Sequence, residues 1–386
     1  MTTLDLHPAA ASKLNLPAIK AAMDEHGLSA ATMAKKMEVS RESVSKWLGG
    51  EAVPRPDKLL KLSILLKLKR AQLLEGVADT SALQPQVAFR MSRAKQPQTH
   101  HVARARHMGK LLEVLVPHLP FDRFVSPPAL KNPTSDYQYL QSFALRVRKE
   151  MGLSESGTIN VSTLAGWFRK LQAVIVPVLW GHRSGHENAI HIFLPKTSTT
   201  WVYLNLDTRL ADLKFWLAHE LGHTYTFSTL QGDEGEDFAD GFAGALLFPQ
   251  SACQALYEEL RSVRSMSTRI QHVKKAADSL EISMVCVAKQ LDRYAEKIGA
   301  AKLIDDHASL YQVNELSKPV VASKALFESD EIDLDDLMRT SDRVFHSPVF
   351  EALRAYVQEK KAPATYVQAI LDCSLVDAKQ IVAELA

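Results

Sequence analysis

Two histidines four residues apart, His219 and His223, constrain the fold of this 386-residue chain more than any other feature. They lie in a largely apolar stretch, residues 213–227, whose pattern favours an α-helix. Residues four apart share one face of a helix, so both imidazole rings can bind the same metal ion. The alternative is a pair of core histidines whose hydrogen bonds are satisfied within the protein.

Glu220 follows the first histidine and completes an H-E-x-x-H motif. The glutamate is rotated off the line of the two histidines, where it can hold a water molecule bound to the metal. Zinc lowers the pKa of such a water to about 7, and a neighbouring carboxylate can accept its proton. We therefore expect zinc as the cofactor and Glu220 as the general base of peptide hydrolysis.

Two acidic residues, Glu236 and Asp240, follow the H-E-x-x-H motif and can complete a zinc site. A catalytic zinc ion needs a third protein ligand and leaves its fourth position open to water or substrate. Glu236 can be this third ligand, while Asp240, four residues later, can accept a hydrogen bond from a ligand histidine and orient its ring. Small residues around them would let the two helices approach closely.

The segment F-W-L-A-H-E-L-G-H, followed by E-D-F-A-D-G-F-A-G-A-L-L-F-P, resembles the ImmA/IrrE family of zinc metallopeptidases. This resemblance covers about residues 130 to 295 and implies a small thermolysin-like fold that cleaves repressors or related regulators. It also implies that His219, His223 and Glu236 bind the metal, with Glu220 as the base and Asp240 as the orienting residue. Phe238 departs from the family, which often has an acidic residue there.

The N-terminal region has the pattern of four short helices. Ser29 can cap the second helix, and Ser40 can cap a third helix that begins at Arg41 and ends at Gly49 and Gly50. A Leu-rich fourth helix follows, from Asp57 to about Lys69. Within the third helix, Val44 and Trp47 can face the core while the polar residues point outward.

This pattern is similar to the phage-repressor (XRE) type of helix-turn-helix over about residues 12 to 70. The resemblance implies that double-stranded DNA is a partner and that the third helix enters its major groove. It departs at Ala30, where such repressors usually have Gln. The alternatives are a helical bundle with solvated lysines or a surface for protein contact. The expected base-reading residues are Arg41, Glu42, Ser45 and Lys46, and the expected phosphate contacts are Lys35 and Lys36.

Charge is distributed unevenly between the two parts of the chain. Residues 1–110 hold 18 Lys and Arg against 9 Asp and Glu, whereas the remainder holds 28 against 35. A basic segment joined to an acidic body is typical of a phosphate-binding module attached to another domain. The polar, basic stretch at 76–120 is interpreted as a linker, part of which could add phosphate contacts.

The predicted fold is α+β and mostly helical. We expect a helix-turn-helix bundle at 1–75, a metallopeptidase domain with a small sheet at 121–299, and a helical region without assigned chemistry at 300–386. Three apolar runs predict strands at 174–179, 189–193 and 201–206, and one amphipathic stretch predicts a helix at 276–298. Three nearby histidines are expected at the surface or at the rim of the site: His182, His186 and His191.

Several classes of protein are disfavoured. No apolar stretch approaches the roughly 18 residues of a membrane helix, and no signal peptide is expected. Three scattered cysteines argue against a disulfide framework. We therefore expect a cytoplasmic protein with no membrane partner.

Two functions remain open. The chain could be a DNA-binding regulatory peptidase that cleaves a repressor or itself. It could instead be a transcription regulator whose peptidase-like domain senses a ligand or holds a homodimer without proteolysis. Retention of Glu220 favours the peptidase, because metal binding alone needs no base.

Overall fold

The computed structural model divides into two units, residues 1–84 and residues 85–386. Each unit is described by itself. The structure describes residues 14–68, 73, 84–89, 99–121, 130–180, 189–226, 229–316, 320–327 and 333–386.

The first unit is a bundle of short helices. Ser29 and Ser40 cap the second and third helices, and each hydroxyl accepts a hydrogen bond of 3.1 Å from the backbone N–H three residues later. Val44 and Trp47 are buried, as expected from their spacing. The predicted helix-turn-helix is confirmed, with α1 at Leu16–Glu25, α2 at Ala30–Met37, α3 at Arg41–Leu48 and α4 at Pro56–Leu66.

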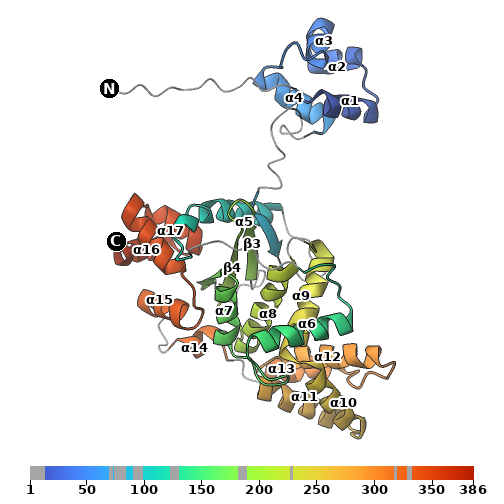
Figure 1. Cartoon of the computed structure of the whole chain (residues 1–386), viewed down its shortest axis with the longest axis vertical. Coiled ribbons are helices and arrows are strands. Elements are labelled where there is room, and N and C mark those ends of the chain that lie inside the picture. Colours follow the sequence, from blue (N-terminus) through green and yellow to red (C-terminus); the bar gives the residue numbers. More distant parts are fainter. Residues whose placement is uncertain are drawn as a thin grey trace. The chain divides into compact units, whose positions relative to one another are not determined.

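A four-stranded mixed sheet forms the centre of the second unit (Figure 1). Its order is β1-β3-β4-β2, with β2 and β4 parallel and the other pairs antiparallel. Successive side chains alternate between the two faces of a strand, so each face has its own core. The strands are β1 at Gln86–Phe89, β2 at Ala173–Val178, β3 at Ala189–Leu194 and β4 at Thr199–Asn205.

One face of the sheet packs against the helices that carry the predicted site. Ile175, Val202 and Leu204 point from the strands into this core, which continues between the helices. The helices around this core are α6 at Tyr137–Glu150, α7 at Val161–Lys170, α8 at Leu210–Thr226, α9 at Gly232–Leu247, α10 at Gln250–Arg261, α11 at Met266–Leu280, α12 at Met284–Lys297, α13 at His307–Leu316 and α14 at Ala322–Leu326.

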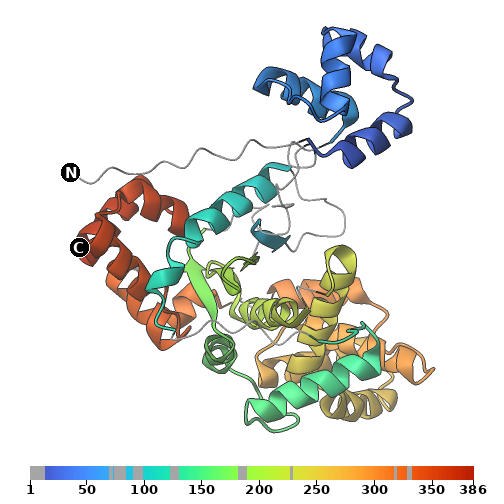
Figure 2. The same cartoon turned by 45° about the horizontal axis from the view of Figure 1, so that its top comes forward.

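The opposite face is covered by α5 and the C-terminal helices (Figure 2). Val176, Ile192 and Tyr203 point into this second core. The elements on this side are α5 at Thr99–Leu112, the 3₁₀ helix η2 at Val116–His118, α16 at Val349–Lys360, α17 at Ala364–Leu371 and α18 at Leu375–Leu385, preceded by α15 at Leu334–Arg343.

The mostly helical fold class is confirmed, but three expectations change. The linker interpretation of 76–120 is wrong in part, because β1 pairs with β3 and α5 packs on the sheet. The helix predicted at 276–298 is broken where Glu281 takes a left-handed conformation (φ 52°) and Ser283 caps α12. The 300–386 region is part of the second unit and supplies one cover of its sheet.

Within the described residues, no helix combines the length and apolarity needed to cross a membrane.

Candidate metal centre

Helix α8 presents His219 and His223 on one face, one turn apart. Their Nε2 atoms lie 3.1 Å from each other, and their side chains are 0% and 4% exposed. Phe215 and Trp216 place their rings 6.4 and 6.1 Å from the His219 ring, so aromatic side chains border this end of the site. The two imidazole nitrogens are thus held close together in a largely water-free setting.

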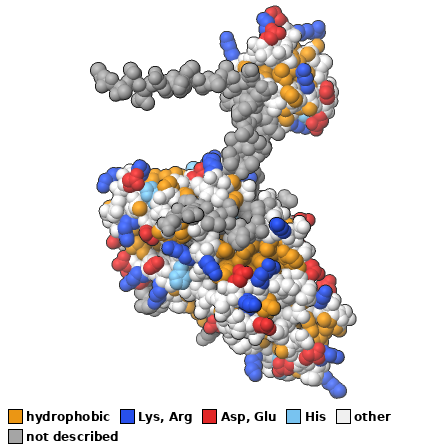
Figure 3. Space-filling model, viewed as in Figure 1, with side chains coloured by type: hydrophobic (Ala, Val, Ile, Leu, Met, Phe, Trp, Pro, Cys, Tyr) orange, Lys and Arg blue, Asp and Glu red, His pale blue; other side chains and the backbone are white. Residues whose placement is uncertain are grey.

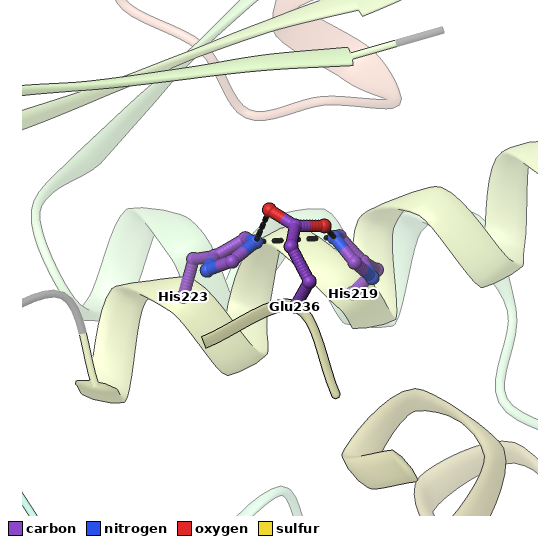
Figure 4. Close-up of side chains that lie close together, drawn as sticks. All are labelled: His219, His223 and Glu236. Atoms are coloured by element: carbon purple, nitrogen blue, oxygen red, sulfur yellow. Dashed lines mark hydrogen bonds and ion pairs between the residues drawn. The ribbon is translucent and has the colours of Figure 1, made fainter. Parts of the chain in front are cut away.

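Glu236 on α9 completes the group. Its Oε1 lies 3.2 Å from His223 Nε2, and its Oε2 lies 3.4 Å from His219 Nε2. The carboxylate lies between the two rings, with one oxygen toward each (Figure 4). Among the described residues, these three side chains form a group that could hold a metal ion, with ligand atoms within 4.8 Å of one another.

Close packing of α8 on α9 places this carboxylate. A Cβ atom added to Gly222 would lie 2.9 Å from the Cα of Ala239, so the two backbones touch at a point where only glycine fits. Ala239 is fully buried, and Phe242 packs against the same glycine. Ala239 therefore has the use expected of the small residues of α9, whereas Gly241 and Gly244 lie against Arg293 and Gln290 of α12 and not against α8.

Asp240 lies on the far side of the His219 ring. Its Oδ1 is 2.9 Å from His219 Nδ1. The other nitrogen of the ring, Nε2, is left to face His223 and Glu236. Burial lowers the pKa of His219, but hydrogen bonds to Asp240 and Glu236 outweigh burial and raise it to about 9. Burial likewise raises the pKa of Glu236, whereas hydrogen bonds to His219 and His223 bring it down to about 2. Without a metal ion, the site therefore holds a proton on His219.

The Glu220 side chain lies against His191 of strand β3. The distance from His191 Nδ1 to Glu220 Oε2 is 3.3 Å, and the side chains are 0% and 2% exposed. Burial raises the pKa of the Glu220 carboxyl group, but the hydrogen bond to His191 and the charges of the two α8 histidines lower it by more. The carboxyl group is therefore ionised at neutral pH. A buried carboxylate beside the donor group has the charge state that a general base requires.

The expectation that His191 lies at the surface or rim is wrong. It occupies the middle of β3, fully buried, and its ring is 5.8 Å from that of His223. Ile190 and Ile192 point to the opposite core, so strand alternation turns His191 toward α8. The sequence feature that could have indicated burial of His191 is its position within the apolar run at 189–193. His182 and His186 lie outside the described residues.

The predicted DNA-contacting residues are all exposed on α2 and α3. Lys35 and Lys36 lie in the last turn of α2, and Arg41 begins α3. Lys46 Nζ lies 2.8 Å from Glu42 Oε1, so these two side chains form an exposed ion pair. The arrangement leaves one face of α3 polar and accessible.

Two family models match the chain. One, described as helix-turn-helix, matches residues 19–73, and the other, described as IrrE N-terminal-like domain, matches residues 177–292. No curated protein matches the chain. The two resemblances drawn from the motifs are thereby confirmed: the chain joins an XRE-type helix-turn-helix to an ImmA/IrrE-like peptidase domain. Such a combination is that of a DNA-binding regulator with a peptidase-like domain.

Proposed function

We propose that this chain is a regulatory zinc peptidase, which binds DNA through its first unit and cleaves a repressor-like protein, or itself, with its second. The observation that carries the proposal is the position of Glu220: a buried carboxylate adjoins a group of three convergent ligands on the same helix. Metal storage or a purely structural metal would not require this carboxylate.

The donor set is suited to zinc. Ligands about 2.0–2.1 Å from a tetrahedral zinc ion lie about 3.3 Å from one another. Here the two imidazole Nε2 atoms are 3.1 Å apart, and each lies 3.2 or 3.4 Å from one of the two Glu236 carboxylate oxygens. Two imidazoles and one carboxylate are a common ligand set of catalytic zinc and leave a fourth position open. When bound, zinc would supply a Lewis acid that polarises a peptide carbonyl and acidifies water.

The protein residues divide the remaining work. Glu220 accepts a proton from the attacking water and delivers it to the amine nitrogen that leaves when the peptide bond breaks. Asp240 holds the His219 ring through Nδ1, so that Nε2 would be available to bind the metal. Phe215 and Trp216 exclude water from one side, which strengthens each electrostatic contact.

Zinc affinity should rise with pH. His219 carries a proton below pH 9 in the metal-free site, because its pKa is raised to about 9, and zinc must displace that proton. The apparent affinity is therefore expected to rise about tenfold per pH unit through the neutral range and to level off near pH 9. Competition titration with a zinc-binding dye measures this slope. Asp240→Asn should move the plateau to lower pH, whereas a flat profile in the wild type would contradict the assignment.

His191 is expected to orient Glu220, and its substitution separates this role from packing. Leu and Asn have nearly the same shape, but only Asn can donate a hydrogen bond to the carboxylate. His191→Leu should lower kcat about 10- to 100-fold with KM and zinc content little changed. His191→Asn should recover much of that loss. Equal activity of the two variants would remove the positioning role.

The DNA part of the proposal assigns base contacts to the exposed face of α3. Arg41 and Ser45 can donate to base edges, and Lys46 can do so once it leaves Glu42. Lys35 and Lys36 are placed to bind phosphates, which fix the position of the helix without reading sequence. The outward direction of all these side chains supports this assignment.

The function is tested by cleavage with and without metal. The zinc-loaded full-length protein is incubated with the regulators encoded beside it, and peptide fragments are identified by mass spectrometry. Cleavage, including release of the first unit, is expected with zinc and should disappear when zinc is removed with a chelator. Zinc binding without any cleavage would favour the regulator that senses a ligand or partner without proteolysis.

A further inference from the structure

The C-terminal helices repeat the local geometry of the first unit. Helices α2 and α17 are each 8 residues long and end at a left-handed residue, Glu38 (φ 55°) or Asp372 (φ 52°). Two residues after the left-handed residue, Ser40 or Ser374 caps the next helix by accepting a 3.1 Å hydrogen bond from the backbone N–H three residues further on. Helix α16 precedes α17 as α1 precedes α2.

Burial follows the same pattern in both places. In α3 the buried residues are Val44 and Trp47, the fourth and seventh positions of the helix. In α18 the fourth and seventh positions are Ala378 and Ile381, and both are buried. The α16–α18 segment therefore has the internal packing of a helix-turn-helix as well as its turn.

The turn alone does not define a binding surface. Helices α11 and α12 are joined in the same way, by left-handed Glu281 and the capping residue Ser283. There, however, the second helix is enclosed, because its first, third and fifth residues, Met284, Cys286 and Ala288, are all buried. In α18 the residues at these three positions, Leu375, Asp377 and Lys379, are exposed, and Val376 beside them is 76% exposed.

The open face of α18 carries side chains that can read bases. Lys379 and Gln380 are exposed beside Val376. Lys can donate to guanine, Gln can pair with adenine, and an apolar side chain can contact the thymine methyl group. The acidic residue on this turn, Asp377, is held by the cap, because Ser374 Oγ donates a 2.7 Å hydrogen bond to its carboxylate.

Basic side chains also lie on helix α5, which neighbours this segment. Helix α5 packs against α17, where the Tyr366 hydroxyl donates to the backbone oxygen of Leu111 (2.9 Å), and Arg104 pairs with Asp372. Together α5 and residues 349–386 hold 7 Lys and Arg against 5 Asp and Glu, compared with 9 against 6 in residues 14–68 of the first unit. Figure 3 shows basic and acidic side chains interspersed over the second unit. The charge balance is thus close to that of the first unit.

We infer that α16–α18 form a second helix-turn-helix that binds double-stranded DNA, with α18 in the major groove and Lys360, Lys361 and α5 at the phosphates. The chain would then have two separate DNA-binding surfaces. This inference goes beyond the peptidase and does not depend on its activity.

The test removes the first surface and then the second, in the full-length protein. Arg41→Ala with Lys46→Ala disables α3, and fluorescence anisotropy measures binding to a short mixed-sequence duplex between 50 and 200 mM salt. This variant should retain salt-dependent binding. Adding Lys379→Ala and Gln380→Ala should weaken the remaining binding about tenfold and lower the salt slope by about one. Adding Lys297→Ala instead, at an exposed position of α12, should change neither quantity.

The outcomes separate the two DNA claims. Complete loss of binding in the α3 variant, or binding insensitive to Lys379→Ala with Gln380→Ala, would overturn the second surface. So would a change in self-association without a change in DNA binding, since α18 would then contact protein. If the α3 substitutions have no effect while the α18 substitutions do, only the assignment to α3 fails. Unchanged circular dichroism confirms that the exposed substitutions leave the fold intact.

Discussion

Glu220→Gln is expected to abolish cleavage while leaving zinc bound. The amide has the shape of the carboxylate but cannot accept the proton of the attacking water, and loss of a general base typically lowers the rate by about 10²- to 10⁴-fold. Zinc affinity should change little, because Glu220 lies against His191 and not among the three donors. Fragment formation and zinc content are measured on the same preparation.

The control for this variant is Glu234→Gln, which removes an exposed carboxylate from the first turn of α9. It should cleave like the wild type. If Glu220→Gln cleaves as fast as Glu234→Gln, another group takes the proton and the proposed role of Glu220 is wrong.

Gly222→Ala is expected to disrupt the metal site without touching a ligand. The added Cβ would lie 2.9 Å from the Ala239 Cα, so α9 must shift. Overpacking of this kind typically costs about 1–3 kcal/mol of unfolding free energy. Because Glu236 moves with α9, zinc affinity should also fall by about 10- to 100-fold, as when a supporting contact is lost. Urea unfolding and zinc titration measure the two effects.

Gly166→Ala is the matched control, since it changes a glycine inside another helix of the same unit. There the new Cβ would meet only His346 at 3.5 Å, an ordinary contact. Alanine is favoured over glycine within a helix, so stability should stay equal or rise by about 1 kcal/mol. Equal behaviour of the two variants would show that α8 and α9 can separate without cost to the site.

Local signals explain what the sequence could predict. Ser29 and Ser40 mark helix starts by a hydrogen bond within one turn, and the spacing of His219 and His223 fixes their common face. These features depend only on residues close in sequence. The helix-turn-helix and the pairing of the two histidines on α8 could therefore be predicted from the order of the amino acids alone.

Non-local packing explains what the sequence could not predict. Strand β1 has only four residues in a polar stretch, and its pairing partner β3 lies about 100 positions away. Alternation places His191 opposite Ile190 and Ile192, but only the packing of α8 on that face brings it to Glu220. The break at Glu281 was missed because a glutamate, not a glycine, takes the left-handed conformation there.

The most direct test of the metal centre is X-ray absorption at the zinc edge of the purified, zinc-loaded protein. Two imidazole nitrogens and carboxylate oxygen at about 2.0–2.1 Å, with no sulfur and one zinc per chain, are expected. A sulfur shell, a single imidazole, or a protein that retains no zinc would contradict the convergence of His219, His223 and Glu236 on one ion.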